Sequence, residues 1–89
     1  MKSKDKASEI ARRIEKLNEN NKYPIMLACE MLGHPTWAVD CWPASKRVFC
    51  SHTLQAMCKL TEELDCTYYI TTKLTCGKQM VPVFRFFAL

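Results

Sequence analysis

Glycine is scarce in this chain: only Gly33 and Gly77 occur among 89 residues. Loops that cradle phosphate groups or dinucleotides need several closely spaced glycines, because their backbone turns sharply and approaches the ligand closely. A P-loop, a G-x-G-x-x-G motif and a G-x-S-x-G motif are therefore excluded. With four prolines and two glycines, the chain also lacks the composition of collagen or of a flexible linker. We expect a folded domain.

Long apolar runs and dense basic blocks are missing as well. No run approaches the roughly 18 residues of a membrane span. The opening stretch MKSKDKASEIARRIEKL lacks the apolar centre of a signal peptide. The net charge of +4, from 13 basic and 9 acidic residues, gives a mild preference for anionic partners. A chain of this length predicts one domain, residues 1–89, with residues 1–4 disordered.

Cysteine pairs with zinc-ligand spacing are absent, although six cysteines occur at positions 29, 41, 50, 58, 66 and 76. Structural zinc sites normally use C-x2-C pairs, and Cys50 with His52 makes only half a site. Two residues apart on a helix, these side chains also point in different directions, which disfavours a catalytic Cys–His pair. We predict no catalytic residue, no metal and no cofactor. Reduced thiols in a cytoplasmic protein are expected, with a disulfide framework as the alternative.

Two segments in the first half show the spacing of amphipathic helices. In residues 4–19 the apolar stripe consists of Ile10, Ala11, Ile14 and Leu17, and the following asparagines predict the helix end. In residues 23–33, YPIMLACEMLG, the stripe consists of Leu27, Ala28, Met31 and Leu32. Pro24 suits the first turn of this second helix and Gly33 its end. Because it carries almost no charge, we predict it to be the most buried of three helices.

The third helix is predicted over residues 45–64, with Ser45 or Ser51 as its N-cap. Its apolar face contains Leu54, Met57, Cys58, Thr61 and Leu64. Between the second and third helices, residues 36–43 (TWAVDCWP) alternate apolar and polar side chains, which favours a short strand or an extended connection.

Residues 67–87, TYYITTKLTCGKQMVPVFRFF, predict a β-hairpin that turns at Gly77. A shift of one residue in strand pairing moves every side chain to the other face, so the parity of the loop can be predicted. A loop with an odd number of residues pairs Ile70 with Phe84 and gathers Tyr69, Lys73 and Arg85 on the opposite face. An even loop would oppose Ile70 with Arg85. We predict the odd loop, and we expect Pro82 at an edge or an irregular position.

The order of helix, short helix, helix and basic hairpin resembles the winged helix-turn-helix family. The stretch that carries the likeness is SHTLQAMCKLTEELDCTYYITTKLTCGKQMVPVFRF, mainly residues 51–86. The fold class that follows is α+β, with three helices and then a C-terminal antiparallel β-hairpin. The resemblance implies binding of double-stranded DNA by a bacterial, phage or plasmid regulator of transcription, with the third helix in the major groove and the hairpin as a wing.

Mapped onto this chain, the resemblance assigns DNA contacts to two groups of side chains. The recognition helix would use Lys46, Arg47, Ser51, His52, Gln55 and Lys59, and the wing would use Lys73, Lys78, Gln79 and Arg85. The linker from Gly33 to Ser45 is longer than the family's turn, and Glu62, Glu63 and Asp65 follow the recognition helix closely.

A protein partner or a homodimer is the alternative reading. Four aromatic side chains motivate an inhibitor or adaptor, because exposed apolar patches mark partner surfaces; they are Trp37, Trp42, Phe86 and Phe87. A zinc-binding domain is a distant third hypothesis, and no membrane partner is expected.

Overall fold

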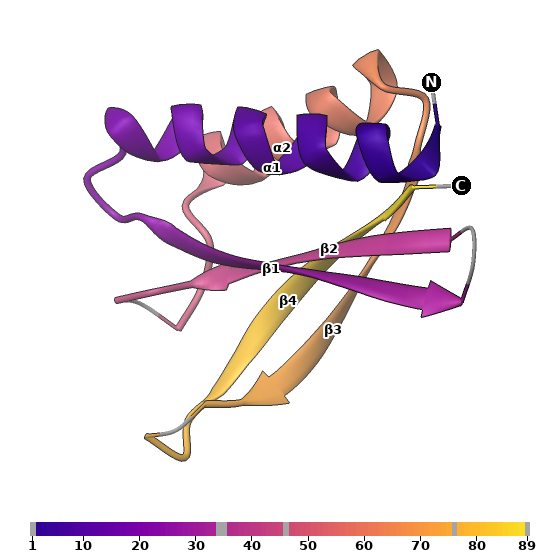
Figure 1. The fold of residues 1–89 in the computed structure, drawn as a ribbon. Helices are drawn as coiled ribbons and strands as arrows, with labels where there is room; N and C mark the ends of the chain where they lie inside the picture. Colours follow the sequence, from indigo (N-terminus) through magenta and orange to yellow (C-terminus); the bar gives the residue numbers. More distant parts are fainter. Residues whose placement is uncertain (1, 34–35, 46, 76, 89) are drawn as a thin grey trace.

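In the computed structural model, which describes residues 2–33, 36–45, 47–75 and 77–88, the chain forms two helices and a four-stranded sheet. Helix α1 (Ser3–Glu19) is followed by strands β1 (Ile25–Gly33) and β2 (Thr36–Pro43). Helix α2 (Ser51–Glu63) is followed by strands β3 (Thr67–Leu74) and β4 (Met80–Ala88). The order helix–strand–strand thus occurs twice (Figure 1).

The sheet is antiparallel throughout, with strand order β1-β2-β4-β3. The second strand of each half lies inside, where β2 pairs with β4 through Val39↔Phe86 and Cys41↔Phe84. The first strand of each half, β1 or β3, forms an edge. Both hairpins are local in the sequence, whereas the central pairing joins the two halves.

Both helices lie on one face of the sheet (Figure 1). Ala7, Ile10 and Ile14 of α1 recur at helical spacing and are buried, as are Met57 and Leu60 of α2. They form one core cluster with side chains of the inner strands, Val39, Cys41, Phe84, Phe86 and Ala88. The helix pair therefore covers β2 and β4, and β3 keeps both its faces largely exposed.

The expected fold class, three helices followed by a hairpin in a winged-helix arrangement, is wrong. The chain has two helices among its described residues and a sheet of four strands. The segment predicted as the second helix, residues 23–33, contains strand β1 instead. It is also far from being the most buried element, since Met26, Met31 and Leu32 are exposed.

Strand β1 forms because β2 is available to pair with it. The sequence of β1 alone does not reveal this pairing. Its pairing with β2 places Ile25 opposite Pro43 and Leu27 opposite Cys41, and both β1 side chains pack into the core cluster. At its start, the side chain of Asn18 accepts a hydrogen bond from the Ile25 amide at 3.0 Å and donates one to the Ile25 carbonyl at 2.8 Å. Helix α1 therefore ends within the asparagine-rich stretch, as predicted, with Asn20 as its C-cap, and Asn18 in its last turn fixes where β1 begins.

The last predicted helix starts later than expected. Helix α2 begins at Ser51, with Cys50 in the N-cap position and no side-chain cap, so neither Ser45 nor Ser51 caps it. Val48 is exposed outside the helix. Residues 36–43 form strand β2, as the alternation predicted.

The hairpin and its register are confirmed. Leu74 pairs with Met80, Ile70 with Phe84 and Tyr69 with Arg85, as the odd loop requires. Pro82 lies in an inner strand, but the pairing of β4 with β2 covers only residues 84–88. Its missing amide hydrogen therefore falls where β4 has no neighbour on that side.

The sheet face away from the helices is covered by its own long side chains. Tyr69 stacks on Phe87 with ring centroids 5.2 Å apart, and Lys73 lies over the ring of Trp42. Beneath them Ala38, Val81 and Val83 are buried, although they do not belong to the core cluster under the helices. Within the described parts of the chain, neither helix has the length and apolar character that a membrane crossing requires.

Candidate nucleic-acid interface

The turn of the β3–β4 hairpin holds Lys78 in a left-handed backbone conformation. The Lys78 amide donates to the Thr75 carbonyl at 2.9 Å, and the Thr75 amide donates to the Gln79 carbonyl at the same distance. The φ angle of Lys78 is 60°, a region that costs a residue with a Cβ roughly 1 kcal/mol or more. The hydrogen bonds thus fix the course of the backbone at the hairpin tip, which extends away from the helices (Figure 1).

At the base of this tip lies a hollow of about 690 Å³, called here the hairpin pocket. It is formed by β1, the end of β2, the segment after β2 and the two ends of the hairpin. Its lining consists of Met26, Trp42, Pro43, Ala44, Ser45, Arg47, Lys73, Leu74, Thr75, Gly77, Gln79 and Val81. The volume is within the usual range of ligand pockets, about 300–1,000 Å³.

The hairpin pocket brings together basic side chains from two distant segments. Arg47 comes from the segment before α2 and Lys73 from β3, and no carboxylate occurs among the described residues that line it. The ammonium of Lys73 lies 3.4 Å from the centroid of the Trp42 ring, a cation–π contact that holds both groups at the wall. Gln79 adds an amide. Cations, an aromatic ring and a hydrogen-bonding amide are therefore concentrated in one hollow.

Arg85, the fourth residue assigned to the wing, forms ion pairs with acidic neighbours. It donates to both carboxylate oxygens of Asp40, from Nε at 2.6 Å and from Nη2 at 2.8 Å, and Glu30 lies 3.6 Å away. The hydrogen bonds to Asp40 raise the pKa of the Arg85 guanidinium above its ordinary value. The structure therefore places Arg85 in an ion-pair cluster on the helix-free face, and its charge is already neutralised.

Of the described residues assigned to a recognition helix, Arg47 alone lies with the hairpin. Ser51, His52, Gln55 and Lys59 are exposed on α2, while Arg47 lies before the helix and lines the hairpin pocket. His52 is within 3.5 Å of the hydroxyl of its neighbour Thr53. Lys46 lies outside the described residues. The exposed surface of α2 also carries Glu62 and Glu63, so it is not uniformly basic.

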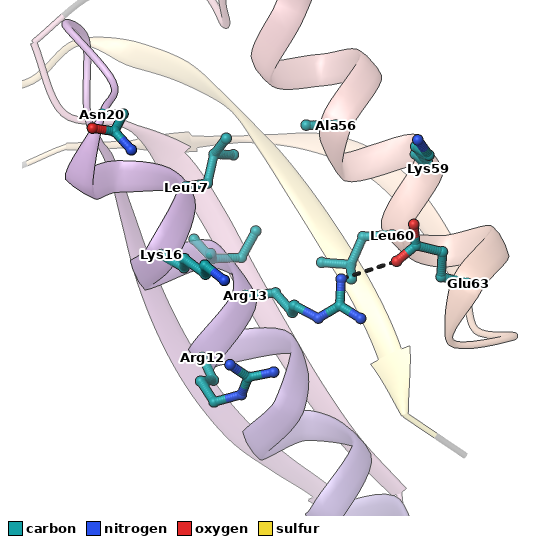
Figure 2. Close-up of a pocket in the computed structure, with 10 residues that line it drawn as sticks. Arg12, Arg13, Lys16, Leu17, Asn20, Ala56, Lys59, Leu60 and Glu63 are labelled. Atoms are coloured by element: carbon teal, nitrogen blue, oxygen red, sulfur yellow. Dashed lines mark hydrogen bonds and ion pairs between the residues drawn. The ribbon is translucent and has the colours of Figure 1, made fainter.

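A second basic hollow, the helix groove, separates α1 from α2 and has a volume of about 680 Å³. Figure 2 shows Arg12, Arg13 and Lys16 extending from α1, and Glu63 of α2 meeting Arg13. Arg13 donates to Glu63 at 2.9 Å, and both arginines donate to Glu9. The carboxylates thus neutralise much of the groove's charge.

Sequence reasoning missed α1 as a source of site residues. Arg12, Arg13 and Lys16 all fall within the first predicted helix, but nothing local showed that they border Lys59 of α2. The signal that was available is the concentration of three cations within two turns. Only the packing of the helices turns it into a groove.

The arginines of α1 predict a pH dependence of stability. Hydrogen bonds from Arg12 and then Arg13 lower the pKa of the Glu9 carboxyl from 4.5 to about 2. A lowered pKa stabilises the folded state above pH 4.5, and this contribution is lost as the pH falls toward 2. We expect Glu9→Gln to have a lower thermal midpoint than the wild type at pH 7, with the two curves converging toward pH 2. Because Glu9 is at the surface, the difference should be small. Glu15→Gln, at an exposed site that forms no ion pair with another described residue, is the control. A difference in thermal midpoint that persists at low pH would contradict the assignment.

The cysteines carry free thiols at the five described positions, 29, 41, 50, 58 and 66. Burial raises the pKa of Cys41 to about 12, so this thiol is a poor nucleophile. No group of three or more His, Cys, Asp or Glu side chains that could hold a metal occurs among the residues the structure describes. Cys76 and His34 lie outside the described residues.

The aromatic side chains that motivated a protein partner are mostly covered. Phe86 is fully buried, and Trp37, Trp42 and Phe87 are half-buried. The exposed aromatic rings are instead those of Tyr68 and Tyr69, on edge strand β3.

Comparisons with family models, with curated proteins and with solved structures found no match for this chain.

Proposed function

We propose that the protein binds nucleic acid through the hairpin pocket, with single-stranded chains as the preferred form. The supporting observation is that Arg47 and Lys73 line the same hollow, and that none of the described residues lining it is an Asp or a Glu. Phosphate groups need cations that are not already paired with acids. Lys78 at the neighbouring hairpin tip adds a third positive charge.

The preference for a single strand comes from the shape and lining of the pocket. A concave site with Trp42 in its wall, and with Met26 and Val81 beside it, suits a base that has left its stack. Aromatic platforms beside a basic groove are the usual arrangement for single-stranded nucleic acid. Duplex recognition by a helix has less support, because the exposed surface of α2 carries two carboxylates, Glu62 and Glu63, beside the cation Lys59. The carboxylates would repel the phosphates of DNA.

A cytoplasmic location belongs to the same proposal. The five free thiols at described positions support a reducing compartment. A role in regulating transcription, expected from the resemblance, would depend on this nucleic-acid binding.

The test is fluorescence anisotropy with labelled single-stranded and duplex DNA of equal length, titrated at low and moderate salt. Removing two phosphate contacts in Arg47→Gln/Lys73→Gln should weaken single-strand binding by about 10-fold or more and flatten the salt slope by roughly 1.4. The control Lys2→Gln/Lys4→Gln removes the same charge from exposed sites far from the pocket in sequence.

Two results would contradict the proposal. One is the absence of binding at low salt, and the other is an equal loss of affinity in both double variants, which would indicate a general charge effect. Tighter binding of the duplex would refute the preference for single strands.

A further inference from the structure

Strand β3 is an edge strand with few of the features that usually protect sheet edges. Its sequence, TYYITTKL, contains no proline or glycine and one charged residue, Lys73. It pairs with β4 along its full length without an irregularity. The other edge, β1, differs: its register shifts between Met31 and Gly33, and it carries Glu30. Natural proteins blunt exposed edges because regular ones pair with other strands.

The backbone groups of β3 that face solvent can be assigned from the hairpin turn. Thr75 donates its amide to Gln79 of the opposite side. In an antiparallel pair, residues alternate between bonding their neighbour and pointing away. Residues 67, 69, 71 and 73 therefore bond β4. The amide and carbonyl groups of Tyr68, Ile70 and Thr72 point outward, where the sheet order provides no further strand.

We propose that a second copy of this chain pairs with β3, antiparallel, around a two-fold axis near Ile70 and Thr71. With this axis perpendicular to the sheet, even-numbered residues of one copy pair with even-numbered residues of the other. The outward amides and carbonyls then satisfy each other, both helix layers lie on the same side, and the result is one continuous eight-stranded sheet.

The side chains of β3 suit this self-pairing. Tyr68, Ile70 and Leu74 share the helix side of the sheet with Met80, and all four are between 45% and 60% exposed. Pairing would place this apolar strip beside its own copy. Despite the net charge of +4, like charges would not be directly opposed, because an axis near Ile70 and Thr71 sets Lys73 of one copy opposite position 67 or 69 of the other.

The size of a stable interface sets a requirement for this pairing. A specific interface takes about 800 Å² from each partner, which is roughly one-seventh of the 5726 Å² surface of the chain. The exposed groups that would contribute to it are the helix-side strip, Tyr69 on the opposite face and the outward backbone groups of β3.

The test is sedimentation equilibrium of the full chain across the micromolar range. We expect a mass that rises toward twice 10.3 kDa. Ile70→Lys places like charges near the two-fold axis and should raise the dissociation constant at least tenfold. Met31→Lys changes an equally exposed residue, 53% against 50%, on the other edge and should leave the constant unchanged. A wild type that stays monomeric, or equal effects of both variants, would overturn the proposal.

Amide exchange measured by NMR provides a second readout that needs no variant. The amides of Tyr68, Ile70 and Thr72 should exchange quickly in dilute protein and become protected as the concentration rises. The amides of the alternate residues in β3, at positions 69, 71 and 73, should stay protected throughout, because they bond β4. Protection that does not alternate along β3, or that is independent of concentration, would refute the pairing.

Discussion

Replacing Phe84 by alanine is expected to lower the free energy of unfolding by about 3–5 kcal/mol. Phe84 is fully buried in β4, between Cys41 of β2 and Ile70 of β3. Its ring stacks on that of Tyr68 with centroids 4.6 Å apart and lies 4.8 Å from that of Phe86. The variant loses the transfer free energy of the ring and leaves a cavity at the junction of three strands.

Chemical denaturation of the wild type, Phe84→Ala and Phe84→Leu measures this effect. The leucine variant fills most of the space and should lose less than about 1.5 kcal/mol. Phe87→Ala is the matched control, because Phe87 lies on the helix-free face and is only half-buried. If Phe87→Ala cost as much as Phe84→Ala, the assignment of the main core to the helix side of the sheet would be wrong.

Asp40→Ala should cost about 2–3 kcal/mol, more than an ordinary surface ion pair. The Arg85 and Asp40 side chains are 21% and 20% exposed, and two hydrogen bonds join them. Without Asp40, the ion-pair partner left to the largely covered guanidinium among the described residues would be Glu30, which lies 3.6 Å away and is 62% exposed. Most of the cost comes from leaving Arg85 without its close partner.

A double-mutant cycle separates this pairing from other effects. Asp40→Ala/Arg85→Met should recover much of the loss, because no covered charge remains unpaired. Glu30→Ala should change stability by less than about 1 kcal/mol, as expected for an exposed pair. Additive losses in the double variant would show that the two side chains do not depend on each other.

Predictions from the sequence were correct where the residues of an element determine its structure by themselves, and they failed where a distant segment determines it. The register of the β3–β4 hairpin followed from parity, because an alternative pairing would have opposed Ile70 with Arg85. Helix α1 followed from its stripe and its asparagines. Residues 25–32 are apolar except for Glu30, so periodicity does not separate a helix from a buried strand there, and pairing with β2 decides between them. That pairing is invisible in a local window, so the prediction of a helix was wrong.

The candidate site, too, could be predicted from the sequence only in part. Lys73 and Gln79 were assigned to the wing and Arg47 to the recognition helix, and the structure brings all three to one hollow. The partner of Arg85 could not be predicted, because Asp40 is 45 residues away in the sequence. It is opposite Arg85 only because β2 and β4 are neighbours.

The repeated helix–strand–strand order has a consequence for chain connectivity. Helix α1 begins and β4 ends at the same end of the molecule (Figure 1), and within the sheet the two halves meet through β2 and β4. A circular permutant opened between Pro43 and Ser51, with a short linker joining the original ends, would read α2-β3-β4-α1-β1-β2. It would repeat the same order of elements and keep every strand pairing. The fold therefore does not depend on which half comes first.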